Sequence, residues 1–176
     1  IMIKAKEQLI TPTLLAEAYS YNEYTELVSG LVKNSGTTGM EQTASLINYT
    51  KLNFQRMKRI YKSTILDQHL VEVVRSIQKP VIWLVLVESW CGDVAQNLPV
   101  FARTSELSQN IDLRMILRDS HPDIMEAFLT NGGKAIPKLI MLDALQLASI
   151  NTWGPRPARF QRMLMEYKAN PQIPYE

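Results

Sequence analysis

The sequence predicts an α/β fold: a mixed central sheet flanked by helices, with an all-helical N-terminal extension. The segment VIWLVLV at 81–87 is continuously apolar and rich in β-branched residues, which is typical of a strand buried on both faces. Two more apolar runs, at 111–117 and 136–142, follow with helical patterns between them. A helical crossover makes the first two strands parallel, and a tight turn makes the last two antiparallel.

The first half of the chain contains sequence signals for the starts and ends of helices. Thr11 followed by Pro12 is a favourable cap and first-turn pair, and apolar residues then recur at helical spacing to about Leu31. A break in this helical pattern is expected near residues 20–22.

The segment NSGTTG at 34–39 interrupts the helical pattern. Thr38 and Glu41 stand three positions apart and match a capping box, which predicts that the next helix starts here and runs to about Tyr61. A shorter helix is expected over about 68–77.

The second half completes the alternation of strands and helices. We expect a helix over about 92–107, a helix from Pro122 to about residue 131, a fourth strand over 146–153 after a turn at 143–145, and a terminal helix from Pro155 to about Tyr167. The chain is therefore divided into a helical N-terminal extension at 1–66 and a sheet domain at 67–176.

The composition is that of an ordinary globular protein. Apolar residues make up 46% and charged residues 20%, and 19 basic against 17 acidic side chains leave a net charge of +2. This balance argues against a nucleic-acid binder, and no apolar stretch reaches the length of a membrane span. The run KLNFQRMKRIYK at 51–62 is basic. We interpret it as a solvated helix face, with binding to an anionic surface as the alternative.

The cysteine and histidine content limits the chemistry. A single cysteine, Cys91, excludes an internal disulfide and a CxxC pair. The two histidines, His69 and His121, match no metal-ligand spacing, so no metal site is expected. The first residues lack the apolar core and cleavage site of a secretory signal. Together these features predict a cytoplasmic protein.

Cys91 lies at the junction between the strand at 81–87 and the helix that follows. The carboxyl end of a parallel strand opens onto the edge of the sheet where α/β proteins bind ligands, and a helix N-terminus favours a thiolate. A free cysteine can instead be a small buried apolar residue. The flanking Trp90 and Gly92 indicate an exposed junction, which favours a functional thiol.

The residues Trp90, Cys91 and Gly92 resemble the start of the thioredoxin active-site motif, Trp-Cys-Gly-Pro-Cys, which also follows a buried strand. The order of elements over about 67–168 is also similar to that of thioredoxins. The resemblance implies a thioredoxin-like fold, and the pattern WCGDV looks like a bacterial, monothiol branch with a helical N-terminal extension.

A second match lies at Ile136-Pro137, which resembles the cis-proline loop that faces the cysteine in thioredoxins. The resemblance implies a cis bond here, whereas a proline is also tolerated as the first residue of a strand. Gly154, after Trp153, falls where thioredoxins carry a glycine on the same substrate-facing surface.

The chain departs from the thioredoxin pattern at the positions that carry its chemistry. Val94 stands where the resolving cysteine is expected, so a dithiol cycle within one chain is excluded. Val85 stands where thioredoxins carry a buried carboxylate. Asp93 replaces the motif proline: its charge suits a helix N-terminus but disfavours a nearby thiolate, so the sign of the total effect on the Cys91 pKa stays open.

One hypothesis for the function is a monothiol disulfide oxidoreductase with Cys91 and Asp93 at its catalytic site. Cys91 would form a mixed disulfide with a protein or a small molecule, and an external thiol such as glutathione would resolve it. No bound cofactor is needed. Lys134, Lys138 and Arg156 are expected near the site, where they could hold an anionic thiol or could be ordinary surface charges.

The alternative is a redox-inactive module that keeps the thioredoxin groove for a peptide or protein partner. In either case the expected groove consists of Trp90, Gly92, Ile136, Pro137, Trp153 and Gly154, with Pro155 beside them. Plain core packing is the other interpretation of the two tryptophans.

Overall fold

A computed structural model describes residues 9–170 of the chain. Its helices are α2 (Pro12–Glu17), α3 (Tyr21–Lys33), α4 (Ala44–Ser63), α5 (Gln68–Arg75), α6 (Gly92–Ser105), α7 (Pro122–Ala127) and α8 (Ala158–Ala169), with a 3-10 turn η1 at Arg118–Ser120. Its strands are β1 (Val81–Val87), β2 (Ile111–Leu117), β3 (Lys138–Asp143) and β4 (Ser149–Trp153).

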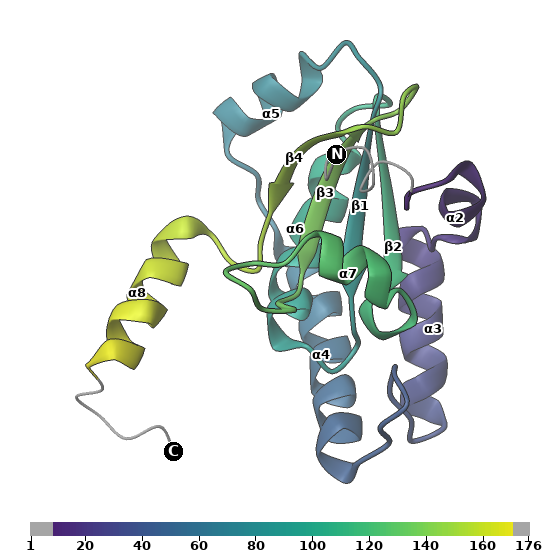
Figure 1. Ribbon diagram of the computed structural model, residues 1–176, viewed down its shortest axis with the longest axis vertical. Helices are drawn as coiled ribbons and strands as arrows, with labels where there is room; N and C mark the ends of the chain where they lie inside the picture. Colours follow the sequence, from purple (N-terminus) through teal and green to yellow (C-terminus); the bar gives the residue numbers. More distant parts are fainter. Residues whose placement is uncertain (1–8, 171–176) are drawn as a thin grey trace.

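The four strands form one mixed sheet in the order β2-β1-β3-β4 (Figure 1). β1 pairs with β2 in parallel and with β3 in antiparallel orientation, and β3 pairs with β4 in antiparallel orientation. The predicted mixed sheet is therefore confirmed. Every residue of β1 except Val81 is buried, which accounts for its continuous apolar sequence.

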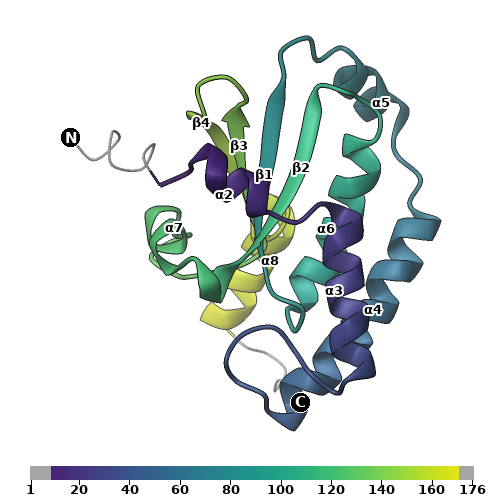
Figure 2. The ribbon, with the colours of Figure 1, turned by 90° about the vertical axis from the view of Figure 1, so that its right-hand side faces the viewer.

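Helices cover both faces of the sheet. Figure 2 shows α7 on one side of the strands and α6 on the other, with α4 outside α6, whereas α3 contacts both α4 and strand β2. α4 packs along α6, the helix that follows Cys91, and α3 packs against α4. The boundary at residue 66 between an extension and a sheet domain stays a prediction. α8 buries no residue, and Figure 1 shows it extending away from the sheet.

The predicted break in the first helical stretch separates α2 from α3. Tyr19 lies in this break and makes an isolated antiparallel bridge with Met115, with backbone N–H···O distances of 2.9 and 2.8 Å. Tyr19 thereby pairs with part of the exposed edge of β2. A capping box follows at once: the Ser20 hydroxyl accepts from the Glu23 N–H, and the Glu23 carboxylate accepts from the Ser20 N–H.

The capping box predicted at Thr38 and Glu41 is wrong. α4 begins at Ala44, and the side chain that caps it is Thr43, whose hydroxyl accepts from the Leu46 N–H. Thr38 is buried and forms hydrogen bonds with Ser89, so a tertiary contact has taken the side chain that the local pattern assigned to a cap.

Three other predicted boundaries shift by three residues or more. α7 ends at Ala127 rather than near residue 131. β4 starts only at Ser149, because the Asp143 carboxylate accepts two backbone N–H groups and widens the turn. α8 starts at Ala158 rather than at Pro155, because a residue that precedes a proline, here Arg156, is disfavoured in helical conformation.

Candidate functional site

Cys91 is the N-cap residue of α6 and lies in the turn that leaves β1. Its side chain is half-buried, and Sγ lies 3.5 Å from the carbonyl oxygen of Ile136. The Ile136-Pro137 peptide bond is cis, as the resemblance implied. The structure therefore brings the cysteine and the proline loop together, although 45 residues separate Cys91 from Ile136.

The environment of Cys91 raises the pKa of its thiol. Burial is the largest cause, and the negative charge of Asp93 acts in the same direction. The backbone N–H groups of Val94 and Asp93 face the sulfur and lower the pKa, as does the positive charge of Arg118. Burial wins, so the resting form of Cys91 at neutral pH is the thiol.

Asp93 is held by Arg156 in a two-point ion pair. Arg156 Nε lies 2.9 Å from Asp93 Oδ1, and Nη2 lies 2.5 Å from Oδ2. The pair connects the first turn of α6 to the segment after β4. It also engages the Arg156 guanidinium, for which the sequence left open a contact to an anionic thiol or an ordinary surface charge.

The two predicted lysine contacts are engaged elsewhere. Lys134 Nζ lies 2.6 Å from a carboxylate oxygen of Glu126. Lys138 is buried, and its Nζ donates to the Thr130 hydroxyl at 3.0 Å. Like Arg156, both side chains already have a protein partner, and their role in holding an anionic thiol stays a prediction.

The two valines that stand where thioredoxins carry the resolving cysteine and the buried carboxylate both lie in the core. Val85 is 0% exposed in the middle of β1, and Val94 is 1% exposed in α6. Each valine therefore contributes packing at its position.

A carboxylate is nevertheless buried beside the cysteine, at a position that we did not single out from the sequence. Glu88 follows β1 directly and is 0% exposed, and its Oε1 accepts the Asp119 N–H at 2.9 Å. Its Oε2 is buried without a hydrogen-bond partner. Burial raises the pKa of the Glu88 carboxyl, while hydrogen bonds from Thr38 and Asp119 act against this rise.

Tyr24 of α3 reaches the same buried region. It is 0% exposed, and its hydroxyl has no hydrogen-bond partner. Its pKa is raised well above the ordinary value, mainly by burial and further by the charges of Glu88 and Cys91. An acidic residue directly after an apolar strand is a signal that could have revealed Glu88. No local signal marks Tyr24.

Ser89 attaches the N-terminal helices to the turn that carries Cys91. Its Oγ lies within hydrogen-bond distance of three buried threonine hydroxyls and also accepts the Thr38 N–H at 3.0 Å. The three are Thr37 at 3.2 Å, Thr38 at 3.1 Å and Thr50 at 2.9 Å. The Ser89 carbonyl accepts from the side-chain amide of Asn53 in α4. The loop before α4, and α4 itself, thus hold the turn in place.

The predicted groove residues lie in different surroundings. Trp90 is half-buried, and the Arg118 guanidinium lies 4.9 Å from the centre of its ring. Trp153 packs edge-on against Phe101 of α6, with 5.1 Å between ring centres, as a core side chain would. Gly154 lies directly against the Pro137 backbone, leaving no room for a side chain.

A pocket of about 400 Å³ adjoins Trp90. It is lined by Thr38, Gly39, Met40, Glu41, Leu46, Trp90, Arg118 and Asp119. One wall therefore comes from the segment before α4 and from α4 itself, and the other comes from the Cys91 turn and from η1.

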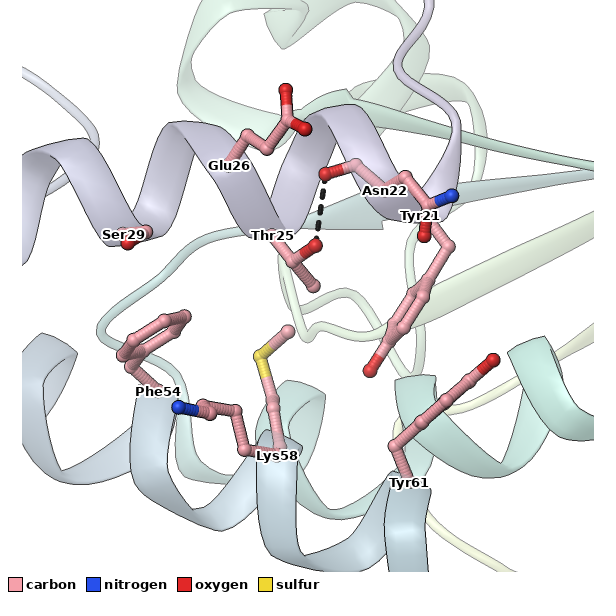
Figure 3. A pocket seen from close by; sticks show the side chains of 9 residues that line it. Tyr21, Asn22, Thr25, Glu26, Ser29, Phe54, Lys58 and Tyr61 are labelled. Carbon is pink, nitrogen blue, oxygen red and sulfur yellow. Dashed lines mark hydrogen bonds between the residues drawn. The ribbon is translucent and has the colours of Figure 1, made fainter.

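A second pocket, of about 340 Å³, lies between α3 and α4. Figure 3 shows Tyr21 and Tyr61 at one end and Phe54 at the other, with the Thr25 hydroxyl bonded to the Asn22 carbonyl at 2.8 Å. The two tyrosine rings stack with 5.1 Å between their centres, and the Tyr61 hydroxyl donates to Glu106. Neither Cys91 nor its neighbour Trp90 lines this second pocket, and we assign no chemistry to the pocket.

The structure is also informative about membranes and metals. Between residues 9 and 170, no helix is both long and apolar enough to cross a membrane. The same part of the chain groups no three histidine, cysteine, aspartate or glutamate side chains as ligands for a metal ion.

The mixed sheet, with a cysteine at the start of α6 facing a cis-proline, defines a thioredoxin-like α/β protein. A family model described as thioredoxin matches residues 39–168. This match covers well over half of the sequence, and the chain therefore belongs to the thioredoxin family.

Solved structures support the fold. A 1.5 Å crystal structure of a protein of unknown function from Pseudomonas aeruginosa has a TM-score of 0.53 and 22% identity, covering 86% of this chain and 88% of that one. An HIV epitope-scaffold has a TM-score of 0.53 and 23% identity, covering 83% of this chain and 81% of that one. Among curated proteins, no match is found.

Proposed function

We propose that the protein is a monothiol disulfide oxidoreductase that acts through Cys91 and uses an external thiol for resolution. The observation that supports this is the placement of the sulfur: it lies at the N-terminus of α6, with the Asp93 and Val94 N–H groups toward it, opposite the Ile136-Pro137 loop. Backbone N–H groups stabilise the thiolate that attacks, and later leaves, in thiol-disulfide exchange.

The exchange runs in two steps. The Cys91 thiolate attacks one sulfur of a substrate disulfide, a Cys91-substrate disulfide forms, and the other substrate sulfur leaves as a thiolate. An external thiolate then attacks this mixed disulfide at the substrate sulfur and releases the Cys91 thiolate. Because its pKa is raised, the thiol is mostly protonated at neutral pH, but its thiolate is a stronger nucleophile once formed. We place this reaction in the cytoplasm, where small thiols are maintained in reduced form.

A redox-inactive binding module is the second candidate. It is favoured by the same burial that raises the pKa of the Cys91 thiol, together with the core position of Val94 where a resolving thiol would lie. In this case a peptide or protein would bind along Trp90 and the Pro137 loop without reacting with Cys91.

Mixed-disulfide formation separates the two candidates. We expect intact-mass spectrometry to show one added glutathione after incubation with glutathione disulfide, and Cys91→Ser to abolish the adduct. A wild-type protein that forms no adduct at pH 8 would exclude the oxidoreductase.

Partner capture tests the module. For a binding module, Trp90→Ala should weaken the capture of a partner from cell extract while Cys91→Ser leaves it intact. Capture that disappears with Cys91→Ser would instead count against the module, because it requires the thiol.

A further inference from the structure

The pocket beside Trp90 is open, charged and built partly from the N-terminal loop. We propose that it binds the amino-acid head group of the low-molecular-weight thiol that exchanges with Cys91. This inference rests on the proposed function, and it adds the class of the co-substrate and the place where it binds.

The pocket adjoins the turn that carries the reacting sulfur, and Cys91 itself does not line it. Trp90, which lines it, is the chain neighbour of Cys91, and Arg118 covers the ring of Trp90 from η1. Arg118 is near enough for its charge to lower the pKa of the Cys91 thiol. In this proposal the head group occupies the pocket, and the rest of the small thiol extends past Trp90 to Sγ.

The pocket offers both charges of an amino-acid head group. Arg118 uses Nε for Asp119 at 2.7 Å and Nη1 for the Lys134 carbonyl at 3.4 Å. Within residues 9–170 its Nη2 and the indole N–H of Trp90 donate no hydrogen bond, so both are available to a carboxylate. Glu41 and Asp119 line the same pocket and would accept from an ammonium group.

Size and shape agree with such a ligand. A pocket of about 400 Å³ lies within the range of small-molecule sites, roughly 300–1,000 Å³. Gly39 has a φ of +84°, and a Cβ there would lie 3.0 Å from Asp119 Oδ2, so a larger residue would crowd this side of the pocket. Leu46 adds an apolar side chain to the lining.

The other cations considered for this role have protein partners. Lys134 is paired with Glu126, Lys138 with Thr130, and Arg156 with Asp93. A ligand carboxylate at any of these would have to compete with an existing contact. Arg118 is itself paired with Asp119 through Nε, but its Nη2 can donate to a ligand carboxylate while that bond is kept.

The low-molecular-weight thiol reacts with Cys91 in its disulfide form. Solvent removes the Cys91 proton, and the thiolate attacks the sulfur nearer the pocket. The bond between the two small-molecule sulfurs breaks, a bond to Cys91 forms, and the departing half leaves as a thiolate that takes a proton from water. Cys91 is oxidised to the mixed-disulfide level and the departing sulfur is reduced.

The test compares two disulfides that differ in the head group. Glutathione disulfide carries amino-acid head groups, whereas cystamine carries amines without carboxylates. Rates of adduct formation at Cys91 are measured by intact mass for both reagents, and each is divided by the rate of alkylation with iodoacetamide. Iodoacetamide has no amino-acid head group, so its rate reports only the reactivity of the Cys91 thiol. The ratio therefore corrects for any effect of Arg118 on the pKa of that thiol.

We expect wild-type protein to react faster with glutathione disulfide than with cystamine. Arg118→Gln should reduce this preference about tenfold, because one charge-assisted hydrogen bond is lost. Leu46→Trp fills the pocket and should slow the reaction with glutathione disulfide only. Arg75→Gln, at an exposed position of α5, is the matched control and should leave the preference unchanged, and circular dichroism verifies the fold of each variant.

The outcomes separate this inference from the proposed function. Adducts that form with both reagents, at a ratio that neither Arg118→Gln nor Leu46→Trp alters, would overturn the pocket assignment and leave the oxidoreductase standing. Failure of wild-type Cys91 to form an adduct with either reagent would overturn both.

Discussion

The backbone of Gly154 lies directly against the carbonyl oxygen of Pro137, so that a Cβ at residue 154 would overlap this oxygen. Gly154 also has a φ of +124°, which side-chain-bearing residues rarely adopt. The contact joins the end of β4 to the loop that faces Cys91, and it explains why glycine is required at this point.

Gly154→Ala should therefore destabilise the protein by more than about 2 kcal/mol, because both the overlap and the backbone strain must be relieved. Urea unfolding followed by circular dichroism measures the loss. Gly30→Ala is the matched control: it lies in α3 with nothing within 4 Å of the added Cβ, and it should leave stability unchanged or slightly raised. Equal effects of the two substitutions would contradict the steric argument.

Replacing Asp93 should activate the thiol. The carboxylate of Asp93 raises the pKa of the Cys91 thiol, so Asp93→Asn should lower it and speed alkylation by iodoacetamide at pH 7 about threefold to tenfold. Arg156→Gln should instead raise the pKa of the Cys91 thiol and slow alkylation, because it leaves the Asp93 charge without its ion pair. Alkylation rates measured from pH 6 to 10 give the three pKa values. A Cys91 pKa that is the same in all three proteins would disprove this assignment.

Glu88 should make the stability of the protein depend on pH. Its pKa is raised in the folded state, so between the ordinary glutamate value and this raised value the folded chain retains a proton that the unfolded chain has lost. The free energy of unfolding should fall as pH rises through this window, by about 1.4 kcal/mol for each pH unit of its width, and level off above it.

The free energy of unfolding of Glu88→Gln should not show this fall. The free energy of the variant minus that of wild type should therefore grow with pH through the window. Urea midpoints at several pH values between 4 and 9 measure the difference. Glu126→Gln, at an exposed position, is the control and should run parallel to wild type. A parallel curve for Glu88→Gln as well would refute the prediction.

Ser89 should control the attachment of the loop before α4. Ser89→Ala leaves buried threonine hydroxyls and the Thr38 N–H without their shared partner, which should cost about 2 kcal/mol. Hydrogen exchange at the Thr38 amide should become faster in this variant. Ser105→Ala is the control, because its hydroxyl bonds only to a carbonyl one turn back in α6. Unchanged exchange at Thr38 would show that Ser89 does not anchor the loop.

Much of the fold could be predicted because it depends on local patterns. The continuous apolar run of β1 identified a buried strand, and the helix between β1 and β2 required a parallel pair, which the sheet contains. The element boundaries were less predictable: Thr38 matched a cap locally, yet its hydroxyl bonds to Ser89, 51 residues away. A tertiary hydrogen bond can thus override a local capping pattern.

The sequence by itself determined the turn that carries Cys91, the absence of a second thiol, and the proline loop opposite. Only the tertiary structure decided the charges around that turn, because ion pairs and buried contacts join residues far apart in the chain. Asp93 and Arg156 meet across 63 positions. Folding also buried Glu88 and Tyr24 near the cysteine, and burial removes the water that would otherwise stabilise a thiolate.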